Sequence, residues 1–245
     1  NHTEKAAEEK GMLIVQVGGP AYRVGFGGGA ASSMLQGENE SSLDFNAVQR
    51  GDAEMEQKMN RVIRACNEMG DKTLIDVIHD QGAGGPANVL KELVEKSGGW
   101  VQIRNIRVGD PTMSVLEIYV AEYQERTGFL IRPENIERFK EICSREKVGC
   151  EVLGEVTRDL RFVVKDAKNN STPVDIDLPV LLGEIPQKTF KDKRIPLGGK
   201  ALNVPEGLTV MSALQDVLRL VSVGSKRFLT NKVDRAVTGL IAQQQ

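Results

Sequence analysis

The sequence contains no long apolar run and almost no excess of charge of either sign. Its longest apolar stretches, such as residues 74–78, fall far short of the roughly 20 residues that a membrane-spanning helix needs, and its first residues lack the apolar core of a signal peptide. Thirty-two basic and 34 acidic residues give a formal charge of −2, so no basic excess favours nucleic acid. We therefore expect neither a membrane nor a nucleic-acid partner.

Cysteine and histidine are also scarce, with three and two residues. The cysteines form no pair of Cys-x-x-Cys motifs that could hold zinc, which predicts reduced thiols in a cytoplasmic protein. Each of Cys66, Cys143 and Cys150 lies in an apolar pattern, and only His2 and His79 could act as a base. Nucleophilic catalysis by a cysteine is therefore disfavoured.

The remaining composition is that of an ordinary globular protein. Forty per cent of the 245 residues are hydrophobic and 27% are charged, which suffices for one large domain or for one domain and part of another. A stretch rich in proline, glycine and lysine, residues 183–205, predicts a domain boundary.

The most unusual stretch is residues 17–33, where a strand-like run leads into six glycines and then two serines. Bare backbone at these glycines predicts a loop whose N–H groups face a phosphate. It is not a Walker loop, because no Gly-Lys-Ser/Thr closes it, and no Asp or Glu ends a following strand about 20 residues on, where a dinucleotide-binding motif requires one. The alternative is a glycine-rich turn that lets two chain segments cross closely.

Elsewhere the hydrophobic pattern alternates between strands and helices. The expected strands are residues 11–17, 73–78, 100–108, 129–131, 150–156, 160–165 and 173–182, the fifth and sixth forming a hairpin. The expected helices are residues 88–96, 134–147 and 209–220, a helical turn at residues 115–118, and a helix that Asp52 begins and Gly70 ends. The methionine stripe of that last helix, Met55, Met59 and Met69, is expected to pack in the core.

A second glycine-rich turn, residues 79–85, follows the second expected strand and carries Asp80. A carboxylate at the end of a strand, followed by glycines and a helix, is typical of sites for metals and phosphates. Asp80 is therefore either a magnesium ligand or a plain cap of the turn, since a hard cation prefers carboxylate oxygen. His79 is expected to be a hydrogen-bonded core residue and not a base.

Three further carboxylates, Glu117, Glu122 and Glu125, lie close together in the sequence. They predict either a polar site or a solvated acidic face, and the second is the commoner explanation of such a cluster.

Taken together, these motifs resemble the phosphoribosylformylglycinamidine synthase family, and its large single-chain eukaryotic form most closely. The resemblance runs through residues 18–33, 43–52, 79–85, 116–118, 122–125 and 229–235, and covers nearly everything from Gly11 onward. Related ATP-dependent enzymes, such as aminoimidazole ribonucleotide synthetase or selenophosphate synthetase, fit less well because of the run of residues 27–33 and the long continuation past Pro205.

The resemblance implies an α+β fold, a mixed β-sheet with helices packed on it, as in the C-terminal domain of aminoimidazole ribonucleotide synthetase. It implies a lead-in at residues 1–10, this domain at residues 11–186, a linker at residues 187–205, and the incomplete start of a following N-terminal-type subdomain at residues 206–245.

The chemistry implied is that of a glutamine-using, ATP- and magnesium-dependent ligase of purine biosynthesis. It converts formylglycinamide ribonucleotide into formylglycinamidine ribonucleotide through a phosphorylated amide, with ammonia from a glutaminase domain. The glutaminase triad and the catalytic histidine of the family do not occur in this chain, so we expect a fragment that is inactive alone and has no catalytic residue of its own. A non-catalytic nucleotide- or phosphate-binding module of the same superfamily is the alternative.

Residue by residue, the resemblance implies a magnesium ligand at Asp80, and it implies substrate contacts at Gln49, Glu122, Tyr123 and Gln124. Tyr123 departs from the Glu-Ser-Gln that many family members show, which puts its side-chain contact in doubt. The glycine loop, with Gly27, Gly28, Gly29 and Ser32, is expected near the substrate phosphate, and Lys226 near an auxiliary nucleotide site.

Overall fold

The computed structural model describes residues 6–26, 34–35, 37–38, 41, 51–122, 125–183, 187–194, 198–199, 201 and 203–225. Contacts divide the chain into two units, His2–Ile185 and Pro186–Gln245. Within the described ranges no helix is long and apolar enough to cross a membrane.

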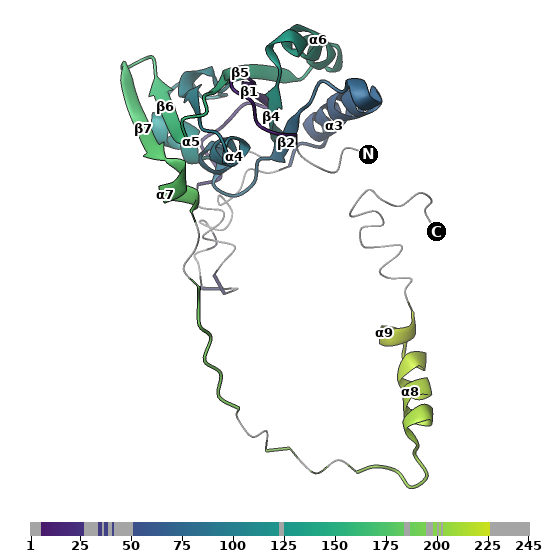
Figure 1. Cartoon of the computed structure of the whole chain (residues 1–245). Helices are drawn as coiled ribbons and strands as arrows, with labels where there is room; N and C mark the ends of the chain where they lie inside the picture. The colour runs from purple at the N-terminus through teal and green to yellow at the C-terminus, as the bar shows by residue number, and fades with distance from the viewer. Residues whose placement is uncertain are drawn as a thin grey trace. The chain divides into compact units, whose positions relative to one another are not determined.

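The first unit is built on one mixed seven-stranded sheet (Figure 1), in the order β2-β4-β1-β5-β3-β6-β7. Its strands are β1 (Leu13–Gly18), β2 (Val77–Asp80), β3 (Gly99–Gln102), β4 (Arg126–Ile131), β5 (Gly149–Val156), β6 (Arg161–Asp166) and β7 (Ser171–Asp177). Neighbouring strands run antiparallel except β3 and β6, which are parallel. Strand β1 lies between β4 and β5, far from both in the sequence.

Helices cover both faces of this sheet. Side chains on opposite faces alternate along β1, because Ile14 belongs to one buried cluster and Val15 to the other. The Val15 cluster holds residues of α3 (Ala53–Asn67) and α6 (Ile136–Glu146), which contact each other. The Ile14 cluster holds residues of α4 (Gly85–Leu93) and α5 (Val115–Val120). This arrangement confirms the expected α+β fold.

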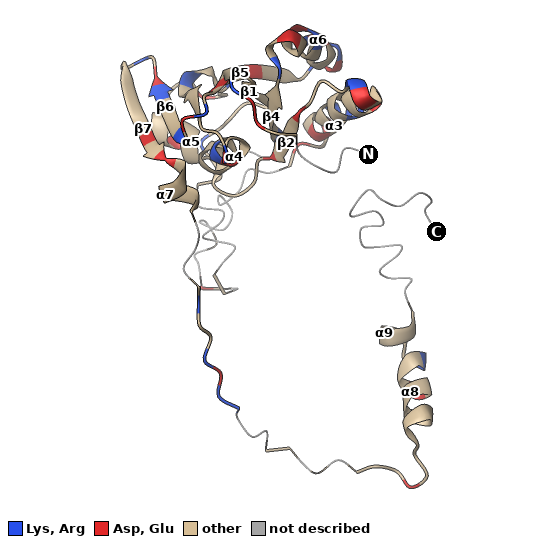
Figure 2. Ribbon diagram, viewed as in Figure 1, with Lys and Arg blue, Asp and Glu red and all other residues tan. Residues whose placement is uncertain are grey.

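Local signals determine the outer helices. Asp52 is the N-cap of α3 and its carboxylate accepts a hydrogen bond from the backbone N–H of Met55. Met59 is buried, and Met55 and Met69 pack against the same cluster, as expected of the methionine stripe. The outward faces of α3 and α6 carry charges of both signs (Figure 2), such as the pair Lys58–Glu54 at 2.5 Å.

Four sequence expectations need correction. The second strand does not cover residues 73–78: it begins at Val77 and ends at Asp80, because Val77 to Asp80 pair with Leu130 to Thr127 of β4. The third strand stops at Gln102, whose side chain accepts from the Arg104 backbone N–H and begins a 3₁₀ turn, Ile103–Asn105. The helix expected at residues 88–96 is α4, which begins at Gly85 after Gly84 turns the chain with φ of 84°.

The fourth correction concerns pairing. Strands β5 and β6 form no hairpin, because β3 lies between them, antiparallel to β5 and parallel to β6. Strand β6 instead forms a hairpin with β7, which ends at Asp177. The residues that follow form α7 (Leu178–Leu182), with Pro179 in its first turn, where a missing N–H does no harm.

In the second unit the described residues form α8 (Val210–Arg219) and α9 (Val221–Gly224). Thr209 and Ser212 make a reciprocal capping box at the start of α8. The helix expected at residues 209–220 is therefore confirmed.

Candidate functional site

The glycine-rich segment after β1 crosses other segments at very short range. Gly18 has φ of 141°, and a Cβ there would lie 2.1 Å from the carbonyl oxygen of Glu125. Gly25 has φ of 77°, and a Cβ would lie 2.4 Å from the carbonyl oxygen of Glu122. The Glu122 backbone N–H donates to the carbonyl of Gly25 at 2.9 Å. In its described part this segment therefore brings two chain segments together, which is the second of the two roles expected of it.

The second glycine-rich turn closes on the same place. It leads from Asp80, the last residue of β2, to Gly85 at the start of α4. Gly85 has φ of 55°, and a Cβ there would lie 2.1 Å from the carbonyl oxygen of Ala121. Both glycine-rich segments thus pack against residues 121 and 122, immediately after α5.

Glu122 is a buried carboxylate at this junction. Its residue surface is 8% exposed, and its Oε2 atom has no hydrogen-bond partner among the described residues. Burial raises the pKa of the Glu122 carboxyl above its usual range. A buried, unpaired carboxyl is costly for folding and is typical of positions where a ligand supplies the partner.

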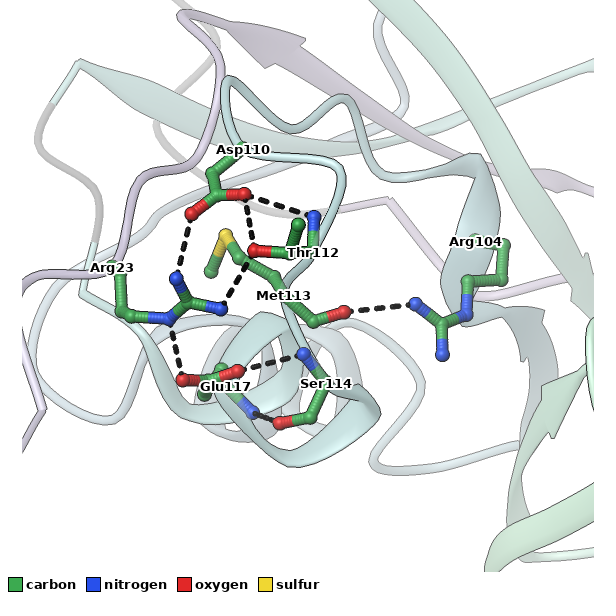
Figure 3. A network of polar contacts seen from close by, with 7 residues as sticks. All are labelled: Arg23, Arg104, Asp110, Thr112, Met113, Ser114 and Glu117. Carbon is green, nitrogen blue, oxygen red and sulfur yellow. Dashed lines mark hydrogen bonds and ion pairs between the residues drawn. The ribbon is translucent and has the colours of Figure 1, made fainter.

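An ionic network joins the glycine-rich segment to α5 (Figure 3). The Arg23 guanidinium donates to Glu117 Oε1 and to Asp110 Oδ2, each at 2.7 Å, and to Thr112 Oγ1 at 3.1 Å. Glu117 also closes a capping box with Ser114 at the start of α5. The hydrogen bond from Arg23 is the main cause that lowers the pKa of the Glu117 carboxyl to about 2. Arg23 therefore holds the segment that carries Gly25 against the helix that precedes Glu122.

Arg104 contacts the turn formed by residues 110–114 from the side opposite Arg23. It donates to the carbonyl oxygen of Met113 at 3.1 Å and pairs with the buried carboxylate of Asp166 at 3.0 Å. Figure 3 shows Arg23 and Arg104 on opposite sides of the turn that connects Asp110 to Ser114. The turn is thereby fixed both to the glycine-rich segment and to β6.

A second polar network is buried within the sheet. The Arg126 side chain is buried and donates to Gly19 O and Gln16 Oε1, each at 2.6 Å, and to Arg107 O at 3.0 Å. Gln16 in turn donates to the side-chain oxygen of Gln81. None of these three side chains is among the site residues expected from sequence. The available signal was a glutamine in the middle of the apolar strand Leu13–Gly18.

Asp80 and His79 lie at the end of β2. The Asp80 side chain is 94% exposed. The ring of His79 lies 2.8 Å from the Asp80 carbonyl oxygen through Nδ1 and 2.8 Å from Glu92 Oε2 through Nε2. His79 is therefore hydrogen-bonded as expected, but it is not a core residue, because 26% of its side chain is exposed.

The residues near Asp80 do not form a complete metal site. Among the described residues no group of three His, Cys, Asp or Glu side chains could hold a metal ion. One exposed carboxylate fits Mg²⁺ only where phosphate oxygens and water supply the other ligands, which is a common mode for this ion.

The three clustered carboxylates have different surroundings. Glu117 pairs with Arg23, whereas Glu122 is buried at the junction. Glu125 has φ of 54°, burial raises the pKa of its carboxyl, and the carboxyl accepts from the Asp52 backbone N–H. The commoner explanation, a solvated acidic face, is therefore wrong for Glu122.

All of the other expected site residues lie outside the described part of the chain. These are Gly27, Gly28, Gly29, Ser32, Gln49, Tyr123, Gln124 and Lys226.

The cysteines are free thiols, with Cys66 and Cys143 buried and Cys150 half-buried. Burial raises the pKa of the Cys66 thiol to about 11. The pKa of the Cys143 thiol is also raised, mainly by a hydrogen bond with Cys150 and to a lesser extent by burial. A high thiol pKa opposes nucleophilic chemistry, in line with the expectation from sequence.

Comparison with known proteins agrees with this architecture. Residues 9–167 match the protein family described as AIR synthase related protein, C-terminal domain. Over its whole length the chain is 52% identical to the probable phosphoribosylformylglycinamidine synthase, chloroplastic/mitochondrial, of Arabidopsis thaliana, of which it covers 18%. The chain spans about a fifth of the length of the curated relatives it matches.

Two solved structures of Thermotoga maritima PurL are also similar. The complex with FGAR (formylglycinamide ribonucleotide) has a TM-score of 0.66 and 28% identity, over 80% of this chain and 32% of that chain. The complex with ATP has a TM-score of 0.61 and 23% identity, over 87% of this chain and 33% of that chain, and shows likeness of fold.

Proposed function

Because the chain belongs to the AIR synthase related protein, C-terminal domain family, we propose that it forms one wall of the substrate site of a phosphoribosylformylglycinamidine synthase. The identity to the Arabidopsis relative supports this, as does the likeness to the PurL structure that holds FGAR. The complete protein is then a ligase of purine biosynthesis that consumes ATP and glutamine. Because the chain covers only about a fifth of its relatives, the glutaminase and the remaining synthetase elements belong to other domains.

One observation carries the proposal: Gly25 and Gly85 close on residues 121 and 122, and the buried Oε2 atom of Glu122 has no hydrogen-bond partner within the described part of the chain. A carboxylate held in this way can accept hydrogen bonds from N–H or O–H groups of a ribonucleotide as soon as one binds. Because the surrounding backbone already fixes Glu122, little ordering remains to be done on binding.

In the proposed reaction the amide oxygen of FGAR attacks the γ-phosphorus of ATP and ADP leaves. Ammonia from glutamine then displaces the phosphate to give the amidine. Within this chain Glu122 holds and orients the substrate, and Asp80 would hold Mg²⁺ through a carboxylate oxygen. When bound, Mg²⁺ offsets negative charge on the phosphates.

The remaining assignments follow from the resemblance to the family. Tyr123 and Gln124 continue the substrate contact of Glu122, and Gln49 adds another. Backbone N–H groups at Gly27, Gly28 and Gly29, with the Ser32 hydroxyl, face the substrate phosphate, and Lys226 contacts an auxiliary nucleotide. The free thiols fit a reducing compartment such as the cytoplasm, although the Arabidopsis relative is named as chloroplastic/mitochondrial.

The test is FGAR binding by the complete synthetase, measured by isothermal titration calorimetry. Replacing Glu122 by Gln should raise the Kd for FGAR about tenfold or more, because a charge-assisted hydrogen bond is lost. Glu134→Gln is the matched control, since Glu134 is exposed in the first turn before α6. Unchanged FGAR affinity in Glu122→Gln would contradict the proposal.

Two further measurements separate enzyme from binding module. Asp80→Ala should weaken the Mg²⁺-dependent binding of ATP by the complete protein, and no change would remove Asp80 from the site. The 245-residue chain alone, given FGAR, ATP, Mg²⁺ and glutamine, should show no turnover. Glutamine-dependent product from this chain would refute the assignment of catalysis to other domains.

A further inference from the structure

A chain of three buried polar side chains crosses neighbouring strands next to the proposed site. Arg126 begins β4, Gln16 lies in β1, and Gln81 directly follows β2. These strands are consecutive in the sheet order β2-β4-β1. Their residue surfaces are 2%, 0% and 5% exposed, so water cannot satisfy the polar atoms.

Chemistry fixes the orientation of both amides. A guanidinium can only donate, so the Gln16 atom that lies 2.6 Å from Arg126 Nη1 must be the oxygen. The Gln16 amide nitrogen then faces Gln81, which must present its own oxygen in return. The Gln81 amide nitrogen is therefore the end of the chain, and it cannot exchange places with the oxygen without breaking the contact with Gln16.

That nitrogen is a buried donor with no partner among the described residues. Leaving such a donor unpaired costs about 1–3 kcal/mol, so a native protein has reason to supply an acceptor. The backbone of Gln81 is held as well, because its N–H donates to Arg126 O at 3.1 Å. Four residues later Gly85 packs against Ala121, the residue before Glu122. An unpaired donor and an unpaired acceptor thus belong to two segments in contact.

We propose that Gln81 is a further substrate-binding residue, whose amide N–H donates to an acceptor oxygen of the ribonucleotide that Glu122 binds. Arg126 and Gln16 act as positioning residues, because they turn the amide so that it presents a donor. The inference rests on the proposed function and adds to it a hydrogen-bond donor opposite in character to Glu122. A substrate that carries both carbonyl oxygens and N–H or O–H groups, as FGAR does, satisfies both side chains.

The test uses the complete synthetase and the Kd for FGAR. Gln81→Glu keeps an oxygen for Gln16 but replaces the NH₂ donor by a second oxygen, so FGAR should bind about tenfold or more weakly at pH 8. Gln81→Met removes both polar groups at similar volume and should weaken binding in the same direction. The KM for ATP should stay within about twofold of the wild-type value. A general loosening of the fold would change the KM for ATP as well. Gln57→Glu, on the exposed face of α3, is the matched control for the change of charge.

The outcomes are distinguishable. Wild-type FGAR affinity in a folded Gln81→Glu or Gln81→Met variant overturns this inference. If Glu122→Gln weakens binding in the same assay while the Gln81 variants do not, only this inference fails. If Glu122→Gln is also silent, the proposed function fails with it. Should Gln81→Glu not fold, Gln81→Met carries the test, since it introduces no buried charge.

Discussion

Replacing Gly25 by Ala should destabilise the first unit and damage the junction at Glu122. Gly25 has φ of 77°, and a Cβ would stand 2.4 Å from the carbonyl oxygen of Glu122, about 1 Å inside ordinary contact at 3.4 Å. A left-handed residue other than glycine costs about 1–2 kcal/mol. Forcing the two backbones apart adds about 1–3 kcal/mol, and loss of the hydrogen bond from Glu122 N–H adds about 1 kcal/mol.

Gly11→Ala separates these contributions. Gly11 has φ of 87°, but nothing lies within 4 Å of the position a Cβ would occupy. It should therefore cost only the conformational part, about 1–2 kcal/mol. We expect Gly25→Ala to be about 2–4 kcal/mol more destabilising than Gly11→Ala.

Urea unfolding monitored by Trp100 fluorescence measures this difference, because Trp100 is the only tryptophan and lies in β3. Equal unfolding free energies for the two variants, within about 0.5 kcal/mol, would refute the claim that Gly25 is required for close packing. In the complete synthetase, Gly25→Ala should also weaken FGAR binding, whereas Gly11→Ala should not.

Burial raises the pKa of the Glu122 carboxyl above 4.5. At a pH between the pKa values of the unfolded and folded states, the folded protein therefore keeps a proton that the unfolded chain has released, and the free energy of unfolding falls as pH rises. Glu122→Gln should therefore remove this loss, so that between pH 4 and pH 7 the change in the urea midpoint is shifted in favour of higher pH relative to the wild type; an unchanged slope would contradict the burial of Glu122. Arg23→Met should raise the pKa of the Glu117 carboxyl from about 2 toward 4.5, as an NMR titration would show, and a pKa still near 2 would mean that other groups hold it down. Because the thiol pKa values of Cys66 and Cys143 are raised, a thiol reagent at pH 8 should modify these residues only after unfolding, and rapid modification of all three cysteines in the native protein would contradict this.

Elements with local signals could be predicted from sequence. Helix α3 was predictable because Asp52 caps it and Met55, Met59 and Val62 recur at helical spacing, so the information lies within one short segment. Helix α8 was predictable for the same reason, with Thr209 as its cap.

Strand pairing was not predictable in this way. Residues 150–156 and 160–165 read as a hairpin because they are adjacent, alternating and separated by a short turn. The structure inserts β3 between β5 and β6, and this choice depends on contacts with residues some 60 positions earlier, such as Gly99 with Phe162. No local pattern encodes which of several apolar strands becomes the neighbour.

For the site, too, residues with a local signal could be predicted and residues that depend on distant contacts could not. Asp80 was indicated by its place between a strand and a glycine-rich turn, and Glu122 by a cluster of carboxylates, while the resemblance to a family gave each a role. Glu122 proves to lie at the junction of the two glycine-rich segments. Gln16, Gln81 and Arg126 were missed, because their importance appears only when three strands are placed side by side. A glutamine within an apolar strand is the trace that such a network leaves in the sequence.

The central place of β1 has a consequence for synthesis of the protein on the ribosome. Its partners are not made until much later: Leu13 pairs with Ile131 and Gly18 pairs with Gly149. During translation the apolar strand Leu13–Gly18 must wait, without its neighbours, until roughly 130 further residues have emerged. This is the period in which an unpaired strand is most exposed to aggregation, and at about 5–20 residues per second it lasts on the order of ten seconds. We therefore expect the nascent chain to depend on chaperone protection until β4 and β5 arrive.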